Sequence, residues 1–266
     1  MTIEQDAAIV TEHLHRYLFA LNYCIGQEVL DLACGEGYGS QILAEKALNV
    51  TGIDIDPEII LYATKKYRAG NLRFLEGNAE SLPVTDQSVD VVVSFETLEH
   101  VPSQDGMLAE IKRVLKPGGL LIISTPDRKF YSEETGHHNP FHLKELFPDE
   151  FRSLLEKYFH PVRLLFQYVQ GSSVIYPTDK KDVQWYGEGD IGYYFTRNTI
   201  PAKYMIALAG CETNIPGLSI FNGKNIVDRI HGGELETVLK SRTYRLGKAI
   251  MAPYQWLRRL FQSNHQ

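Results

Sequence analysis

The sequence predicts an α/β fold with a doubly wound, mostly parallel seven-stranded sheet. Short segments rich in Val, Ile and Leu alternate with helical patterns, and each segment stops at Gly, Asp or Pro. Strands that are apolar on both faces are typical of parallel sheets covered by helices on both sides. The predicted strands are 28–33, 49–55, 72–77, 89–95 and 118–125, with closing strands at 162–169 and 203–209.

Helical patterns separate these strands. The connectors are predicted at 37–47, 57–69, 104–115 and 148–159. Pro57 suits the first turn of its helix, and Pro117-Gly118-Gly119 suits a stop before the fifth strand. Apolar residues at intervals of three and four predict a further, amphipathic helix at 3–24, beside the entrance to a ligand site.

The 266 residues suit one sizeable domain with additions. We expect an N-terminal helical cap (1–25), a ligand-binding domain (26–210) with an insertion at about 170–202, and a C-terminal extension (211–266). The insertion is either a lid or a plain surface excursion. Its aromatic residues either stack on sugar faces or anchor an irregular segment; they are Tyr176, Trp185, Tyr186, Tyr193, Tyr194 and Phe195.

Charge and cysteine content exclude several classes of protein. The formal net charge of −6 disfavours a nucleic-acid partner. Three widely spaced cysteines favour a reducing compartment, and no segment has the length of apolar sequence that a membrane span needs, so we expect a cytoplasmic protein. The tail 239–266 is basic and amphipathic, and it either lies on the anionic inner face of a membrane or packs on its own domain.

The strongest motif is VLDLACGEGYGS at 29–40, where a buried strand enters a glycine-rich turn and then a helix. Such a turn lets the backbone approach a ligand closely, although nicotinamide and flavin sites use glycine turns too. Asp31 lies inside the strand end, where a charge needs a ligand cation or backbone donors. Asp54 ends the second strand, where an acidic side chain can bind both ribose hydroxyls of an adenosine, whereas Asp56 is better placed to cap the next helix.

Together with the segments 50–57, 76–101 and 111–126, this motif resembles the class I S-adenosylmethionine-dependent methyltransferases, particularly the branch similar to quinone-biosynthesis enzymes. The resemblance covers about residues 25–165. It implies S-adenosylmethionine as cofactor, with Gly35 and Gly37 around the methionine portion, Asp31 near its ammonium group and Asp54 on the ribose. It also implies that Asn78 and Ala79 border the adenine, that Phe95 lies near the sulfonium, and that Ala33 and Ile55 complete the cofactor site.

Four histidines are candidate general bases for an oxygen acceptor: His100, His137, His138 and His142. A neutral imidazole can take a hydroxyl proton near neutral pH. His100 could instead be a helix-start residue bonded to nearby backbone. Metal ligation by the last three histidines with Glu133 or Glu134 is an alternative, but we predict no metal site, because the resemblance implies no general need for one.

The methyl acceptor is the most specific prediction. Three segments are similar to bacterial methyltransferases of surface-polysaccharide and glycosyltransferase pathways: the stretch from Gly136, the closing KYMIALAG and the tail. This resemblance implies O-methylation of a sugar hydroxyl in a glycan, a glycolipid or a nucleotide-sugar. The alternatives are a quinone, lipid or secondary metabolite as acceptor, an inactive cofactor-binding scaffold, and an NAD-dependent oxidoreductase.

Overall fold

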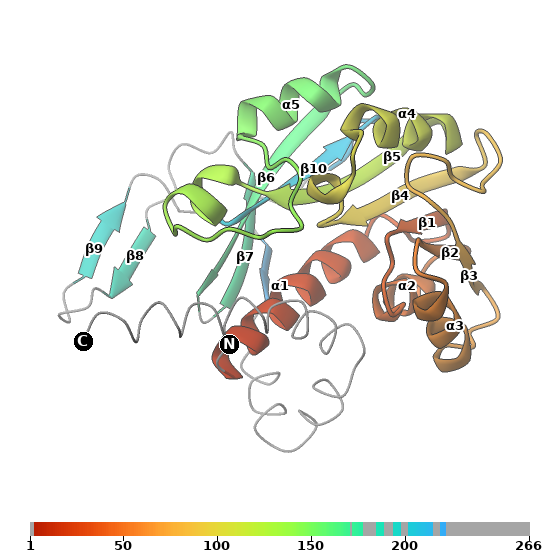
Figure 1. Cartoon of the computed structure of the whole chain (residues 1–266), viewed down its shortest axis with the longest axis horizontal. Helices are drawn as coiled ribbons and strands as arrows, with labels where there is room; N and C mark the ends of the chain where they lie inside the picture. The colour runs from red at the N-terminus through yellow and green to blue at the C-terminus, as the bar shows by residue number, and fades with distance from the viewer. Residues whose placement is uncertain are drawn as a thin grey trace. The chain divides into compact units, whose positions relative to one another are not determined.

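The structure is a computed structural model that describes residues 3–170, 172–177, 185–188, 194–197, 202–214 and 219–221 (Figure 1). Its main element is a nine-stranded sheet in the order β11-β7-β6-β10-β5-β4-β1-β2-β3. The predicted doubly wound fold is confirmed. The seven predicted strands form the continuous run from β6 to β3, and the structure adds two strands beyond β6.

The first five strands are parallel to one another, with β1 at their centre between β2 and β4. Their bounds are β1 Glu28–Leu32, β2 Asn49–Asp54, β3 Leu72–Glu76, β4 Val89–Phe95 and β5 Leu115–Pro126. The closing strands are β6 Val162–Gln170 and β10 Tyr204–Ala209, and β10 is antiparallel to both β5 and β6. Every predicted strand is therefore present.

The predicted insertion begins as part of the main sheet. Strand β7 (Ser172–Pro177) pairs antiparallel with β6, and β11 (Ser219–Phe221) pairs antiparallel with β7. Tyr176 is buried and packs on Phe166, with ring centroids 5.9 Å apart, so for this residue the hydrophobic-anchor alternative is the right one. Strands β8 (Trp185–Glu188) and β9 (Tyr194–Arg197) pair as an antiparallel hairpin. Tyr193, the other connecting residues and the tail 239–266 lie outside the described residues.

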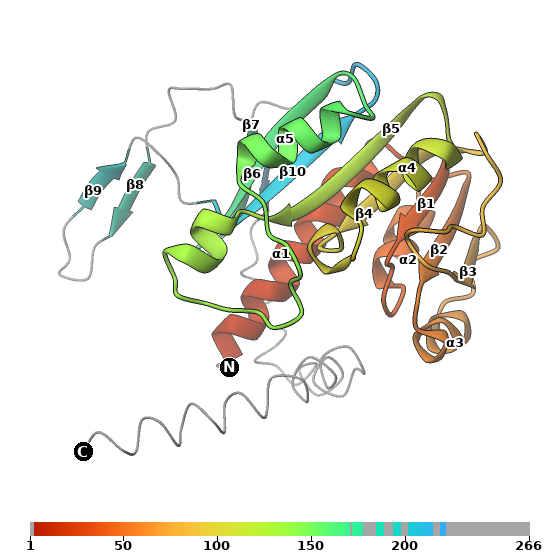
Figure 2. The ribbon, with the colours of Figure 1, turned by 45° about the horizontal axis from the view of Figure 1, so that its top comes forward.

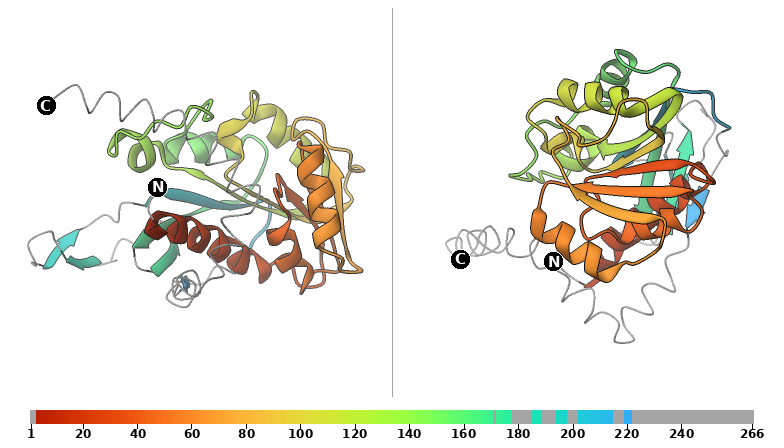
Figure 3. Two further views of the ribbon diagram at one scale, coloured as in Figure 1. Left: turned by 60° about the horizontal axis from the view of Figure 1, so that its bottom comes forward. Right: turned by 90° about the vertical axis from the view of Figure 1, so that its right-hand side faces the viewer.

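The helices cover both faces of the sheet. Figure 3 shows α1 and α2 on one side and α4 and α5 on the other, and Figure 2 shows α4 and α5 in front of the sheet with α1 behind it. The bounds are α1 Ile3–Leu21, α2 Tyr38–Ala44, α3 Pro57–Lys66, α4 Gln104–Val114 and α5 Pro148–Glu156. A buried cluster lies on each face, so the apolar residues on both sides of β1 and β4 are explained. In the described part of the chain, no helix is long and apolar enough to cross a membrane.

The fifth strand starts earlier than predicted. Strand β5 begins at Leu115, so Pro117-Gly118-Gly119 lies within it and does not precede it. The pairing with β4 shifts between Val89 and Val91, and Gly118 has a φ of +77°, which identifies a bulge. The proline and glycines therefore bend the strand rather than end the preceding helix.

Gly37 makes the sharp entry from the glycine turn into α2. Its φ is +82°, and a Cβ there would lie 2.6 Å from the Phe74 ring and 3.0 Å from the Ala63 Cβ. A side chain at this position therefore combines left-handed backbone strain with overpacking.

We expect Gly37→Ala to lower the free energy of unfolding by about 2–4 kcal/mol, the sum of a left-handed penalty and a core clash. The matched control is Gly70→Ala, because a Cβ at Gly70 meets nothing within 4 Å. Urea denaturation followed by circular dichroism measures both variants. Equal stability of the two would contradict the steric explanation.

Candidate active site

The carboxyl ends of β1, β4 and β5 meet at one edge of the sheet. Asp31 pairs in register with Val93, and Phe95 pairs with Ser124, so the ends of the three strands are level. Ala33 (φ +60°) follows β1 and Glu96 (φ +53°) follows β4, both in the left-handed region that favours glycine. Such strain at adjacent strand ends is typical of ligand sites, and parallel sheets bind ligands at this edge.

Asp31 is fully buried at the end of β1. Its carboxylate accepts hydrogen bonds from the Ser40 Oγ at 2.6 Å and from the Tyr17 hydroxyl at 3.2 Å. Burial raises the pKa of Asp31 to about 7, although these two hydrogen bonds oppose the shift. A ligand cation or backbone donors were the expected partners of this carboxylate, and the structure shows side-chain hydroxyls instead. Contact with an ammonium group stays a prediction.

Asp54 holds the glycine turn in place. Its Oδ2 accepts from the Gly35 N–H at 2.9 Å, and its Oδ1 accepts from the Asp56 N–H at 3.1 Å. Asp56 caps α3 by accepting from the Glu58 N–H at 2.8 Å, which confirms its predicted capping role, whereas the ribose contact of Asp54 stays a prediction. A Cβ on Gly35 would meet nothing within 4 Å, so the space beside the turn is open.

The predicted adenine-side residues follow β2 and β3. Ile55 is 67% exposed, an unusual position for an isoleucine. Asn78 is exposed, and its Oδ1 accepts from the Glu80 N–H at 2.8 Å, while Ala79 is half-buried against the core. The structure thus places an exposed apolar side chain and an exposed amide beside Asp54 and the glycine turn, and their contacts with adenine stay predictions.

Helix α1 covers the edge next to Phe95. Tyr17 packs edge-on against the rings of Phe95 and Tyr38, with centroid distances of 5.1 Å and 5.4 Å. A Cβ on Gly39 would lie 2.0 Å from the Tyr17 ring, so this glycine is what allows the helix to approach. The expectation that the N-terminal helix lies beside the site is supported by these contacts.

Beyond Phe95 lies a set of buried charges that the sequence analysis missed. Arg16 is fully buried, and its Nη1 donates to the Gln167 Oε1 at 2.8 Å and lies 3.8 Å from the Glu96 Oε1. Its Nε and Nη2 have no hydrogen-bond partner among the described residues, and the same is true of Glu12 Oε2. The Lys203 Nζ lies 3.5 Å from the Glu12 Oε1. We call Glu12, Arg16, Glu96, Gln167 and Lys203 the polar cluster. An arginine next to Tyr17 on the packing face of the helix was the signal available in the sequence.

Two of the predicted histidines come together at this edge. His100 lies in a 3₁₀ helix, η1 (Leu98–His100), and its ring centroid is 4.8 Å from that of His142. The His100 Nδ1 lies 2.9 Å from the Phe141 carbonyl oxygen, so the interpretation of His100 as a residue bonded to backbone also holds. The His142 Nδ1 bonds the Glu145 carboxylate. Burial lowers the pKa of His142, and this hydrogen bond opposes the shift.

The other two histidines lie outside this pair. His137 and His138 are exposed, although the His137 ring packs against the Tyr131 ring. The Tyr131 ring in turn packs against His142, with ring centroids 5.2 Å apart. The alternative metal site, formed by His137, His138 and His142 with Glu133 or Glu134, is not present among the described residues. Among the described residues, His142 groups with His100 and with Glu99, a residue that sequence reasoning missed.

Glu99 is 1% exposed. Its Oε2 accepts from the Thr125 Oγ1 at 3.0 Å, whereas Oε1 has no hydrogen-bond partner among the described residues. Burial and the neighbouring Glu96 carboxylate raise the pKa of Glu99 well above its ordinary value. The sequence ETLEH, with two acids and a histidine directly after a buried strand, was the available signal.

Comparison with known proteins identifies the glycine-turn half of the chain. Residues 30–123 match a family model described as a methyltransferase domain. This segment is therefore similar to methyltransferase domains. A Mycolicibacterium smegmatis protein described as a "Probable S-adenosylmethionine-dependent methyltransferase" is 41% identical over 134 residues, which are 50% of this chain and 51% of that protein. The likeness to S-adenosylmethionine-dependent methyltransferases therefore covers the part of the chain that contains the glycine turn.

Two further comparisons define the limits of the likeness. The Mycobacterium leprae "Phthiotriol/phenolphthiotriol dimycocerosates methyltransferase" is 38% identical over 98 residues, 36% of each chain. A Haloferax volcanii protein solved in complex with the Trm112 methyltransferase activator has the same fold, with a TM-score of 0.56, 22% identity, and coverage of 80% of this chain and 96% of that structure. The chain spans about half the length, or less, of the curated relatives it matches.

The residues around the glycine turn fit S-adenosylmethionine. The space beside Gly35 is open, and the Asp54 carboxylate at the end of β2 already orients the backbone of the glycine turn. The buried Asp31 carboxylate lies behind the same turn. Donors, acceptors and side-chain-free backbone thus occur where a zwitterionic nucleoside would bind.

The raised pKa of Asp31 predicts a pH dependence of stability. The folded chain keeps this proton between about pH 4 and pH 7, where the unfolded chain releases it, so the free energy of unfolding falls as the pH rises through this window. At 1.36 kcal/mol per pKa unit the fall is at most about 4 kcal/mol. We expect Asp31→Asn to become more stable relative to the wild type between pH 4.5 and pH 8, as measured by urea denaturation.

The matched control for this prediction is Asp90→Asn. Burial works to raise the pKa of Asp90, but hydrogen bonds from Lys116 and from the Glu28 N–H lower it. The contribution of Asp90 is therefore lost only below about pH 4. A relative stability of Asp31→Asn that stays constant across the window would show that Asp31 is ionised throughout.

Proposed function

We propose that the chain is an S-adenosylmethionine-dependent O-methyltransferase whose acceptor is a sugar hydroxyl in a glycan, a glycolipid or a nucleotide-sugar. The observation that supports this acceptor is the polar cluster beside Phe95. Within it, the buried Arg16 Nε and Nη2 and the Glu12 Oε2 have no hydrogen-bond partner among the described residues. Unpaired buried donors and acceptors are costly, and an acceptor rich in hydroxyls would satisfy both kinds.

The polar cluster is built by elements that approach the site from three directions. Arg16 comes from α1, Glu96 follows β4, and Gln167 lies on β6. The Gln167 Nε2 donates to the Glu12 carbonyl oxygen at 3.0 Å, and Ser124 Oγ donates to the Glu96 Oε1 at 2.6 Å. These bonds fix side chains of the polar cluster, so an acceptor would be oriented by preorganised groups.

When bound, the cofactor supplies a methyl group on a positively charged sulfur, so the carbon is already activated. The acceptor oxygen forms a bond to this carbon, the electron pair of the carbon–sulfur bond stays on sulfur, and the hydroxyl proton leaves. The chain must therefore align the oxygen, exclude water and remove one proton. We propose that Glu99, His100 and His142 assist the loss of this proton, because they lie at the same sheet edge as Phe95.

A lipid hydroxyl is the second candidate acceptor. The Mycobacterium leprae relative carries the name of a lipid-modifying methyltransferase, and it shares the domain that contains the glycine turn. A lipid acceptor would also give the basic segment 239–266 a role at a membrane surface, as the sequence analysis considered. That segment lies outside the described residues, and the polar cluster is the observation that favours a sugar.

Asp54→Ala tests the cofactor assignment. We expect binding of S-adenosylmethionine, measured by calorimetry, to weaken about 10- to 100-fold, because hydrogen bonds to a charged group are lost. Asp56→Ala is the matched control: it removes the cap of α3 at a cost of about 1 kcal/mol in stability but leaves the affinity near normal. Unchanged affinity in Asp54→Ala would remove the ribose assignment.

An acceptor screen tests the activity itself. The chain is incubated with methyl-deuterated S-adenosylmethionine and, separately, with nucleotide-sugars, a glycolipid extract, fatty acids and quinones. Mass spectrometry is expected to find a labelled methyl group on a sugar oxygen. A label on lipids or quinones alone would favour the second candidate. Cofactor binding without any labelled product would favour the inactive scaffold.

A further inference from the structure

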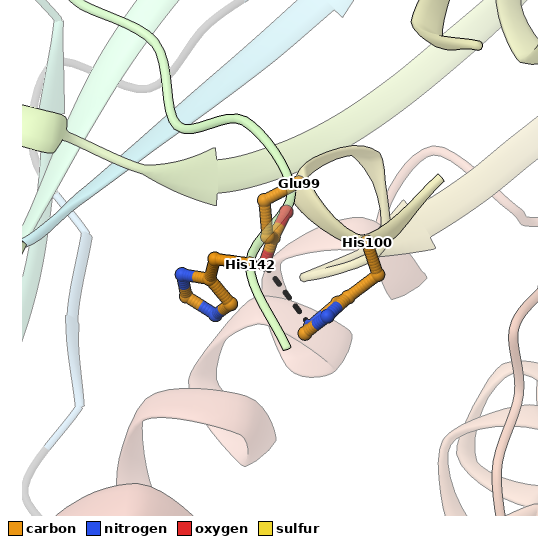
Figure 4. A group of neighbouring side chains, drawn as sticks. All are labelled: Glu99, His100 and His142. Atoms are coloured by element: carbon orange, nitrogen blue, oxygen red, sulfur yellow. Dashed lines mark ion pairs between the residues drawn. The ribbon is translucent and has the colours of Figure 1, made fainter. Parts of the chain in front are cut away.

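Glu99, His100 and His142 form a compact group at the edge of the sheet (Figure 4). One ligand atom from each residue lies within 4.8 Å of the other two. The Glu99 side chain is 1% exposed and that of His142 is 6% exposed, whereas that of His100 is 39% exposed, so the group is open to solvent on one side. Two imidazoles and one carboxylate around an open position are a set that divalent transition metals favour.

The hydrogen bonds of both rings fix the tautomer that a metal needs. A carbonyl oxygen can only accept, so the His100 Nδ1 must donate to the Phe141 oxygen, and the lone pair of the neutral ring lies on Nε2. The His142 Nδ1 bonds the Glu145 carboxylate, which also only accepts when ionised. Metal-binding histidines typically donate their second ring N–H to a carbonyl or a carboxylate in this way.

The third ligand is a buried oxygen with no hydrogen-bond partner. Glu99 Oε1 accepts no hydrogen bond among the described residues, and it lies 3.8 Å from the His100 Nε2. At this distance no hydrogen bond joins the two atoms. Ligand bonds of about 2.0–2.2 Å place two ligand atoms of one ion roughly 3–3.5 Å apart, so a small side-chain rotation suffices.

The backbone holds the group together although His142 is 42 residues beyond His100. The N–H groups of Leu143 and Lys144 donate to the Glu99 carbonyl oxygen at 2.8 Å and 3.2 Å. The Gln104 Nε2 donates to the carbonyl oxygens of Leu98 and Lys144 at 3.1 Å and 3.0 Å. The loop after β5 is thereby fastened to η1 independently of any ion.

We propose that Glu99, His100 and His142 bind a divalent first-row transition-metal ion through Glu99 Oε1 and the Nε2 atoms of both histidines. Three protein ligands leave positions for oxygen ligands on the open side. A hydroxyl bound there would lose its proton more readily, and this consequence rests on the proposed function. The binding of the ion itself does not depend on it.

Titration of the whole chain with Mn²⁺ and Co²⁺ tests the proposal. Calorimetry is expected to show one ion per chain, and bound Co²⁺ is expected to give visible absorption bands that shift when imidazole ligands are lost. We expect His142→Ala and Glu99→Gln to weaken binding more than about 100-fold, and Glu145→Gln to weaken it about 10- to 100-fold through the orientation of His142.

His138→Ala is the matched control, because it removes an exposed histidine of the same loop and should leave metal affinity unchanged. Thermal unfolding of each variant establishes that it is folded, and Glu145→Gln, which keeps all three ligands, serves if a ligand variant does not fold. A wild-type chain that binds neither ion, or equal affinity in His142→Ala and His138→Ala, would overturn the proposal.

A second measurement separates this proposal from the methyltransferase activity. The chain is treated with a chelator, and transfer of a labelled methyl group is compared before and after Mn²⁺ is restored. Metal binding without any transfer would leave the ion site standing and remove the proposed function. Transfer that is equal with and without chelator, by a chain that binds no ion, would remove the ion site and leave the proposed function standing.

Discussion

The arrangement of the site depends on one buried carboxylate. Asp31 is the penultimate residue of β1 and is fully buried, and the hydroxyls of Tyr17 and Ser40 satisfy it. These bonds connect α1, β1 and α2, three consecutive elements of the chain. Because a buried carboxyl without partners is costly, the position of α1 is coupled to the geometry of the glycine turn. Gly39 completes the coupling, since any side chain there would overlap the Tyr17 ring.

This coupling places charged groups in the interior. The residues of α1 that face the sheet include Arg16, directly before Tyr17, and Glu12 one turn earlier, so the packing that buries Tyr17 buries these charges too. Arg16 lies over the Tyr204 ring, with its guanidinium carbon 4.6 Å from the ring centroid. Its Nη1 donates to Gln167 and forms an ion pair with Glu96. A core that served only stability would gain from apolar residues here. The retained charges therefore support a binding role for the polar cluster.

Local sequence patterns predicted the parts of the fold that depend on interactions within a few residues. The strand, glycine turn and helix around Gly35, and the cap at Asp56, follow from propensities and hydrogen bonds within a few residues. The two added strands could not be predicted in the same way, because β7 lies in a segment whose aromatic and glycine content resembles a loop, and β11 has three residues. Their pairing depends on the edge that β6 leaves free, which is a property of the assembled sheet.

The same distinction between local and long-range determinants applies to the candidate site. Asp54 and the glycine turn lie in one βαβ unit, so their positions relative to each other follow from the motif. The choice among four histidines does not, because it depends on how the loop after β5 folds back. Hydrogen bonds from Leu143 and Lys144 to the Glu99 carbonyl turn that loop toward η1, and this brings His142 rather than His138 to His100. The chemistry of the acceptor side therefore depends on three backbone residues that no side-chain motif identifies.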